Sequence, residues 1–300
     1  MEPRPYGPFN YVPVNRRPKI TWPGGARVAL WVAPNIEYFA LDEPLPGDAH
    51  ERPGASAHTP MVREWGARDY GNRVGVFRIM EVLERYGIRA TVSLNSKVCD
   101  AFPEIIEDCL KLDWEFMGHC QGNMHRLSEV PPETEREYIH ETMARIKAAT
   151  GKQPAGWLGA GLAETWNTLD YLVEEGCLYV SDWVNDDQPY MLETDAGPIV
   201  STPYSNEIND FTILTRRGHT TSEMRDILIE ELTVLHREAS EQGSGRMMNV
   251  GLHPHVTGRA YRARAVSEFL EFAKSLEGVW FATREGIAEW YMENNEGHIK

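Results

Sequence analysis

Glu37, His119 and His253 each follow a short apolar run that is typical of a buried strand. In a barrel of parallel strands, the working residues lie just past the carboxyl ends of the strands, so we expect these three side chains to meet. A carboxylate and two imidazoles supply a base, an acid and a polarising donor, which is the minimum set for hydrolysis. The sequence therefore predicts a hydrolytic site built from Glu37, His119 and His253.

Further residues near the expected strand ends suit substrate binding. The segment SDWVNDDQPY is rich in polar acceptors, and it is equally typical of a pocket rim for N–H groups and of a turn with local side-chain hydrogen bonds. Trp157 is expected to form an apolar wall, and Cys120 to be an inert packing thiol. The residues predicted to bind substrate are Asn35, Asn123, Trp157, Asp182, Asp187, Asn209 and His255.

A metal site is the first alternative to this metal-free arrangement. His119 and His125 are six residues apart, which does not place them on one helical face, and Asn123, at i+4 from His119, is a poor zinc ligand. The HPH sequence at 253–255 is expected to point its imidazoles to opposite sides of a strand, so that only one faces the barrel axis. A zinc site of Glu37, His119 and His125 on a loop remains possible, but we favour no metal and no other cofactor.

The elements that position these residues alternate between strand and helix. Strands are expected over 26–33, 89–94, 114–118, 154–158, 178–181, 246–252 and 278–282. Helices are expected over 72–86, 102–112, 132–150, 165–175, 222–241, 262–276 and 284–291. Such alternation indicates parallel pairing with outer helices, and seven or eight units suit a (β/α) barrel. An open doubly wound sheet is the alternative, but no G-x-G-x-x-G follows the first strand.

We expect one catalytic domain over residues 1–300, with an N-terminal extension over 1–23. The stretch 34–70 contains four prolines (Pro34 aside) and is expected to be a long functional loop. No run of about 20 apolar residues is present, so no membrane-spanning helix is expected.

The composition excludes several classes of function. The chain has 300 residues and a formal net charge of −15, which disfavours nucleic-acid and anionic-membrane binding and leaves a small molecule as the expected partner. The extension over 1–23 has no apolar core typical of a secretory signal. The cysteines form no C-x-x-C pair and are interpreted as reduced thiols, so a cytoplasmic location is expected.

Several segments, in order along the chain, resemble the polysaccharide deacetylase superfamily and specifically its allantoinase-like branch. The segments are DYGNRVGVFRIMEVLERYGIRAT, GWLGAGLAET, SDWVNDDQPY, PYSNEINDF, GLHPHVTGRAYR and GVWFATREGIAEW. The resemblance spans nearly the whole chain and implies a distorted (β/α) barrel. Members of the family often assemble, so it also implies a homo-oligomer.

The resemblance also implies roles for particular residues. Deacetylases of the family bind a divalent metal through an Asp and a His-x-x-x-His pair, with a second Asp as base and a later His as acid. The acidic pair matches Glu37 and Tyr38, the histidine pair matches His119 and Asn123, and the later histidine matches His253. The base position keeps a carboxylate, whereas two of the three metal ligands differ. The allantoinase-like branch is similar in lacking the full metal set, and it hydrolyses a ring amide.

The resulting hypothesis is a hydrolase of a non-peptide C–N bond in a small cyclic amide, ureide or imide. Glu37 would take a proton from water, His119 with Asn123 would polarise the carbonyl or orient that water, and His253 would protonate the leaving nitrogen. One alternative is a metal-dependent N-deacetylase of an amino sugar or polysaccharide, with a divalent ion such as zinc. Another is an inactive barrel that binds a ligand.

Overall fold

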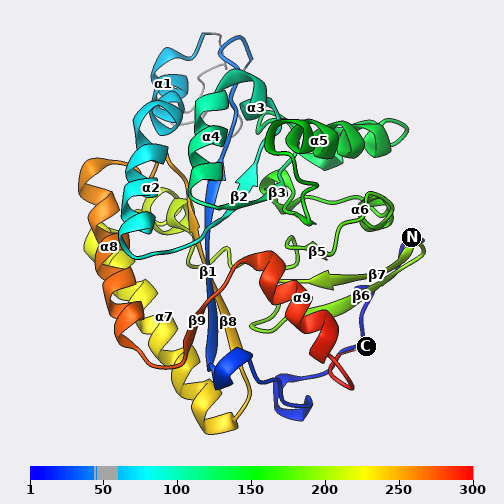
Figure 1. Cartoon of the computed structure of the whole chain (residues 1–300). Coiled ribbons are helices and arrows are strands. Elements are labelled where there is room, and N and C mark those ends of the chain that lie inside the picture. The colour runs from blue at the N-terminus through cyan, green and yellow to red at the C-terminus, as the bar shows by residue number, and fades with distance from the viewer. Residues whose placement is uncertain (44, 46–59, 300) are drawn as a thin grey trace.

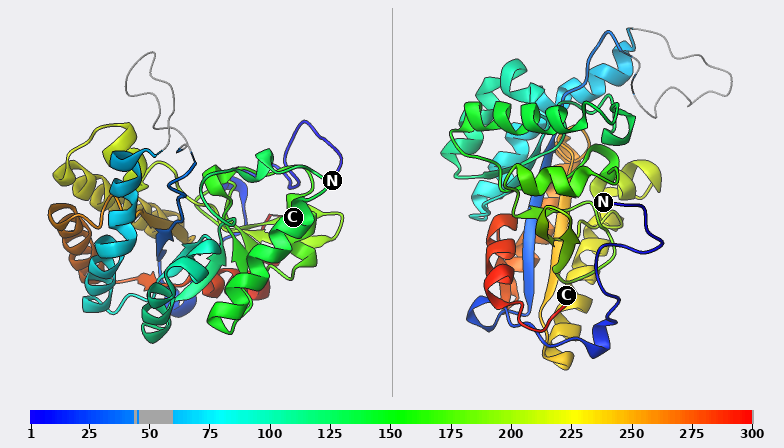
Figure 2. Two further views of the ribbon diagram at one scale, coloured as in Figure 1. Left: turned by 90° about the horizontal axis from the view of Figure 1, so that it is seen from above. Right: turned by 90° about the vertical axis from the view of Figure 1, so that its right-hand side faces the viewer.

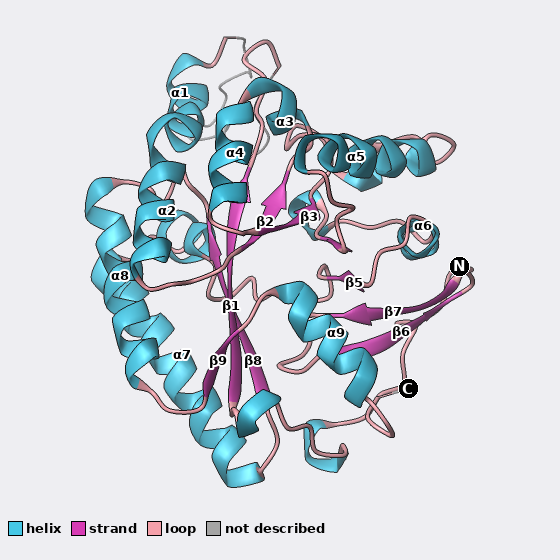
Figure 3. Ribbon diagram, viewed as in Figure 1, coloured by secondary structure: helices cyan, strands magenta, loops and turns pink. Residues whose placement is uncertain are grey.

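A curled sheet of nine strands runs through the molecule, and helices pack against its outer face (Figures 1 and 3). The computed structural model describes residues 1–43, 45 and 60–299. The strands are β1 (Val28–Ile36), β2 (Thr91–Leu94), β3 (Glu115–Gly118), β4 (Gly156–Trp157), β5 (Tyr179–Val180), β6 (Tyr190–Thr194), β7 (Gly197–Ser201), β8 (Arg246–Leu252) and β9 (Val279–Phe281).

Helices alternate with most of these strands, as the sequence predicts. The α-helices are α1 (Val62–Tyr70), α2 (Val76–Arg85), α3 (Lys97–Ala101), α4 (Pro103–Lys111), α5 (Glu135–Thr150), α6 (Thr168–Glu174), α7 (Thr221–Gln242), α8 (Ala260–Ser275) and α9 (Arg284–Asn294). Shorter 3₁₀ or π segments are η1 (Val14–Arg16), η2 (Pro23–Gly25), η3 (Gly71–Gly75), η4 (Leu127–Glu129), η5 (Ala160–Leu162) and η6 (Phe211–Arg216). Seen from above, the helices surround the strands on their outer side (Figure 2).

The strand order is β6-β7-β5-β4-β3-β2-β1-β8, and β9 also pairs with β1. All pairings are parallel except that between β6 and β7, which form an antiparallel hairpin. The expected distorted (β/α) barrel is confirmed as a curled half-barrel of mostly parallel strands. The hairpin at the sheet edge is a difference from the expectation, because the sequence analysis assigned no strand between 182 and 221.

Strand β1 shows why the sheet has a helical side and an interior side. All nine of its residues are buried, as expected for a central parallel strand covered on both faces. Val28, Leu30 and Val32 pack in the cluster that includes the outer helices, whereas Ala29 and Trp31 belong to a second, separate cluster. Because side chains alternate along a strand, Asn35 and Glu37 continue the second series and point to the interior.

The register then brings the strand ends to one level. Ile36 pairs with Leu94, and Leu94 pairs with Gly118, so the residues that follow these strands emerge at the same edge of the sheet. Glu37 and His119 are therefore close in space although 82 positions separate them in the sequence.

Several boundaries differ from the expected ones. The first strand continues to Ile36, and α1 occupies the end of the stretch expected to be a loop over 34–70. The middle of that stretch, residues 44 and 46–59, lies outside the described residues. The short helix α3 was not predicted. None of the described helices is long and apolar enough to cross a membrane.

Candidate active site

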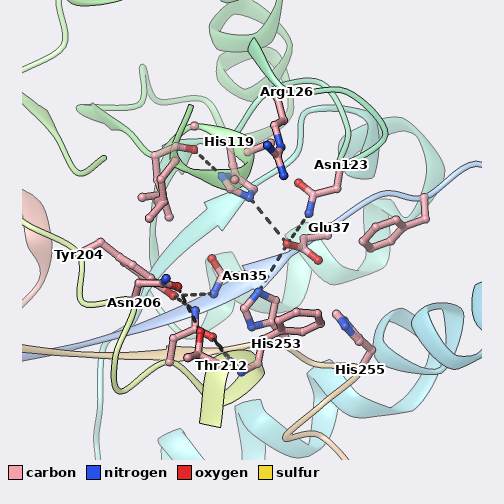
Figure 4. A pocket seen from close by; sticks show the side chains of 18 of the residues that line it. Asn35, Glu37, His119, Asn123, Arg126, Tyr204, Asn206, Thr212, His253 and His255 are labelled. Carbon is pink, nitrogen blue, oxygen red and sulfur yellow. Dashed lines mark hydrogen bonds and ion pairs between the residues drawn. The ribbon is translucent and has the colours of Figure 1, made fainter. Parts of the chain in front are cut away.

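A cavity of about 480 Å³ opens at the carboxyl ends of the central strands (Figure 4). Its floor is built from β1, the segment after β3 and the turn after β8, which are the places where the strand-end rule puts working residues. Seven of the predicted site residues line this cavity. They are Asn35, Glu37, His119, Asn123, Asn209, His253 and His255.

Glu37 lies between two imidazoles. Its Oε1 is 3.8 Å from Nε2 of His119 and 3.7 Å from Nε2 of His253, and it accepts a hydrogen bond of 2.7 Å from Nδ2 of Asn123. Burial tends to raise the pKa of Glu37, but the charge of His253 and the His119 ring outweigh it and lower the pKa to about 2. The carboxylate is therefore ionised throughout the neutral range.

His253 is held as a proton donor by a second carboxylate. Its Nδ1 donates to Oδ1 of Asp210 at 2.7 Å, while Oδ2 of Asp210 accepts from the backbone N–H of His253 at 2.8 Å and from the Thr257 hydroxyl. Burial works against the charged ring, but the carboxylates of Asp210 and Glu37 prevail and raise the pKa of His253 above 6.5. The imidazolium form is thus favoured, with its Nε2–H directed toward Glu37.

The Nδ1 atom of His119 has a backbone carbonyl as its partner, whereas that of His253 has a carboxylate, and the two rings therefore differ in chemistry. Its Nδ1 is hydrogen-bonded to the carbonyl oxygen of Leu158. A carbonyl only accepts, so Nδ1 carries the proton and, in the neutral ring, Nε2 carries a lone pair. His119 can therefore accept a proton from a water beside Glu37, whereas a neutral His119 cannot donate to a substrate carbonyl.

Asn35 and Asn209 are joined beneath the cavity through a tyrosine. The Tyr204 hydroxyl accepts from Nδ2 of Asn209 at 2.7 Å and from Nδ2 of Asn35 at 3.3 Å, which leaves its own hydrogen for another acceptor. Gly251 makes room for this group, because a Cβ at that position would lie 1.9 Å from the Tyr204 oxygen. These polar side chains present amide and hydroxyl groups to the cavity.

His253 and His255 both line the cavity, so the expectation that they point to opposite sides is wrong. Strand β8 ends at Leu252, and the HPH segment belongs to the following turn, where strand alternation no longer applies. The two rings are 5.6 Å apart at an angle of 73°. Burial lowers the pKa of His255 to about 4, so this ring is neutral and aromatic in character.

Trp157 does not line the cavity, contrary to the prediction. It is completely buried among residues of the layer formed by α5 and α6, including Met143 and Leu169. Its neighbour Leu158 lines the cavity instead. The prediction was wrong by one residue, and a shift of one residue reverses the face of a strand.

Asp187 also lies away from the cavity. Its carbonyl oxygen accepts from the N–H of Met247, near the start of β8, whereas His253 follows the end of that strand. Six residues of extended chain separate these levels, or about 20 Å. The substrate contact predicted for Asp187 therefore does not fit its position.

Asp182 supports the cavity wall but is not part of its lining. Its Oδ1 accepts from the N–H of Gly159 at 2.7 Å, which fixes the turn that carries Gly159 along the cavity. Burial raises the pKa of Asp182 to about 6, and burial beside Asp182 raises that of Glu164 well above its ordinary value. Asp182 and Glu164 face a neighbouring cavity of about 630 Å³.

The structure does not assemble the zinc site of Glu37, His119 and His125 that the sequence left open. His125, the predicted third ligand, is 68% exposed and pairs with Glu43 at 3.3 Å. The His119 and His253 rings lie above and below Glu37 in Figure 4, and their Nε2 atoms are 3.8 Å and 3.7 Å from its Oε1. Among the described residues, no three His, Cys, Asp or Glu side chains are grouped to hold a metal.

Three residues that the sequence analysis did not assign have clear places in this site. Asp210 orients His253, Tyr204 connects the two asparagines, and Arg126 points into the cavity in Figure 4. The segment PYSNEINDF contained the first two, but no strand was predicted before it. The strand-end rule therefore could not single them out.

The fold and cavity place the chain in a class of half-barrel hydrolases, and comparisons with known proteins agree. A family profile described as polysaccharide deacetylase matches residues 68–180. A protein described as a polysaccharide deacetylase from Schizosaccharomyces pombe (strain 972) is 29% identical over 238 residues, which cover 74% of this chain and 73% of that protein.

Solved structures show the same likeness over nearly the full length. A structure from Pseudomonas aeruginosa PAO1, described as a polysaccharide deacetylase, has a TM-score of 0.84 and 28% identity, and the match covers 93% of this chain and 96% of that one. Puue allantoinase has a TM-score of 0.81 and 27% identity, with 92% and 94% covered. These matches agree with the resemblance to the polysaccharide deacetylase superfamily, and the neighbours are consistent with its allantoinase-like branch. The chain is a hydrolase of carbon–nitrogen bonds other than peptide bonds, as expected from the sequence.

Proposed function

We propose that this enzyme hydrolyses the C–N bond of a small cyclic amide, ureide or imide. The observation that carries the proposal is the asymmetry of the two imidazoles around Glu37. One ring is held by a carbonyl and presents a lone pair, and the other is held by a carboxylate and presents a proton. Acceptor and donor in one cavity are what ring-amide hydrolysis requires.

The mechanism follows from these assignments. A water bound beside Glu37 and Nε2 of His119 loses its proton to this acceptor pair as it attacks the carbonyl carbon. Asn123 holds the Glu37 carboxylate in place through its 2.7 Å hydrogen bond. His253 donates its Nε2 proton to the ring nitrogen as the C–N bond breaks, and the ring opens to a carboxylate and, on the same molecule, an amine, ureido or amide group.

The substrate's own N–H and C=O groups have partners in the same cavity. Asn35, Asn209 and the Tyr204 hydroxyl provide polar contacts on one side. The volume of about 480 Å³ suits a small ring better than an extended chain. The likeness to Puue allantoinase supports a ring substrate.

The second candidate is N-deacetylation of an amino sugar or polysaccharide. The polysaccharide deacetylase family profile and the relatives described by that activity favour it. In this chain Asn123 stands where the family has a metal-binding histidine, and its amide donates to Glu37. An inactive ligand-binding barrel would not need His253 to be oriented by a buried carboxylate.

Turnover against a matched panel tests the proposal. The panel contains cyclic ureides such as hydantoin and allantoin, cyclic imides such as succinimide, and N-acetylglucosamine oligomers. We expect ring opening of at least one ureide or imide, measured by liquid chromatography, with no acetate released from the sugars. Acetate release without ring opening would favour the deacetylase, and inactivity on every member would favour the binding barrel.

A further inference from the structure

Two arginines that pair with no carboxylate in the described part of the chain stand at the mouth of the active-site cavity. Arg126 precedes η4 and Arg216 ends η6, and both line the cavity while remaining exposed to solvent. Among the described residues, neither guanidinium forms an ion pair. By contrast, the neighbouring Arg217 pairs with Glu207. The chain has a net charge of −15, so the position of Arg126 and Arg216 at one opening, without an ion-pair partner among the described residues, requires a physical explanation.

The structure accommodates both side chains in fixed places. Arg126 lies along Gly161, where a Cβ would meet its Nε at 3.1 Å, so the glycine leaves the wall open for the arginine. Arg216 lies over the Phe211 ring at 5.4 Å, and that ring is 5.5 Å from the ring of His253. Arg216, Phe211 and His253, the proposed proton donor, are thus consecutive neighbours along the cavity wall.

Neither Glu37 nor Glu129 forms an ion pair with the guanidinium of Arg126 or Arg216. Glu37 is buried and engaged with Asn123 and the two imidazoles. Glu129 accepts from the backbone N–H of Arg126, not from its guanidinium. An incoming anion would therefore meet free guanidinium N–H groups before it meets the buried carboxylate.

We propose that Arg126 and Arg216 form a carboxylate-binding subsite, and that the substrate is a cyclic ureide or amide with a carboxylate on a side chain of the ring. The substrate class rests on the proposed function. A guanidinium matches a carboxylate with two parallel N–H donors. In the proposed mechanism the scissile bond lies beside Glu37, which is buried beneath the exposed arginines. The arginines would therefore contact a substrate group away from that bond.

Binding of simple probes tests the subsite without any turnover. Isothermal titration calorimetry would compare glutarate with the neutral glutaramide on the full chain and on R126Q, R216Q and the control R217Q. We expect glutarate to bind more tightly than glutaramide to the wild type and to R217Q. Since hydrogen bonds to charged groups contribute about 1.5–3 kcal/mol, each cavity variant should weaken glutarate binding by about ten- to a hundredfold. Equal binding of both probes by the wild type, or an equal loss in R217Q, would overturn the subsite.

A kinetic comparison links the subsite to the substrate. Hydantoin-5-propionate and its primary amide differ only in charge, and the wild type should have the higher kcat/KM for the acid, mainly through KM. R126Q and R216Q should lose this preference. If neither hydantoin is opened while glutarate still binds through the arginines, the proposed function fails and the carboxylate subsite stands. Equal kcat/KM for acid and amide in the wild type would refute the charged substrate.

Discussion

Replacing Asp210 with asparagine removes a charge without changing the shape of the site. Asp210 is completely buried and holds His253 through two bonds, one to the ring at 2.7 Å and one to the backbone at 2.8 Å. In D210N the amide oxygen can keep the backbone and Thr257 bonds, but its NH₂ group then faces Nδ1 of His253. The ring must present a lone pair there, so it can no longer be a stable imidazolium.

The size of the effect follows from the interactions that are lost. A hydrogen bond to a charged group contributes about 1.5–3 kcal/mol, and one pKa unit corresponds to about 1.4 kcal/mol, so the pKa of His253 should fall by about one to two units. Burial lowers the pKa of the wild-type ring, but Asp210 and Glu37 outweigh it and raise the pKa above its ordinary value, and D210N should remove much of that rise. Activity should fall by about two to four orders of magnitude.

The direction of the pH dependence is fixed by the role of His253. Its protonated form is the active one, so wild-type kcat/KM falls as the pH rises through the raised pKa of His253. In D210N this fall should move to lower pH. NMR titration of the His253 ring measures the same pKa without a substrate, and D186N is a matched control because Asp186 pairs with Arg17 away from the cavity. An unchanged His253 pKa in folded D210N would refute the reasoning.

Three further outcomes are expected. E37Q should keep its fold in circular dichroism but lose about a hundred- to ten-thousandfold in turnover, because a general base is removed; near wild-type turnover would contradict its role. H253A should reduce kcat more than H255A, because only His253 is bonded to Asp210 and faces Glu37; the opposite order would move the proton donor to His255. Activity should survive exhaustive chelation, and stoichiometric metal by elemental analysis, with activity lost on removal and restored by zinc, would contradict this.

The central part of the fold and site was accessible from sequence because two simple periodicities govern it. Apolar runs of four to nine residues mark the central strands, and helices with periodic apolar faces separate them. Parallel pairing then requires that residues following different strands share one edge. This reasoning alone brings Glu37, His119 and His253 into one cavity.

The features that the sequence did not predict depend on local backbone geometry, which an apolar pattern does not reveal. Strand β4 has only two residues, so the register that decides between Trp157 and Leu158 had no alternation to support it. The strands of the β6–β7 hairpin have only five residues each, and missing the hairpin concealed Asp210. The turn after β8 points His253 and His255 the same way, which strand periodicity could not predict.

The two histidines beside Glu37 illustrate how identical side chains acquire different chemistry. In sequence, His119 and His253 are equivalent, since each follows a buried strand and each is expected near Glu37. In the structure, the partner of Nδ1 distinguishes them. The Leu158 carbonyl accepts a hydrogen bond but adds no net charge, whereas the Asp210 carboxylate accepts a hydrogen bond and also stabilises a positively charged ring. Glu37 lies 3.7–3.8 Å from both rings, so it cannot account for the difference. In the proposed mechanism, His119 accepts a proton and His253 donates one. This difference is therefore determined by the partners of their Nδ1 atoms, which are the backbone carbonyl of Leu158 and the buried carboxylate of Asp210.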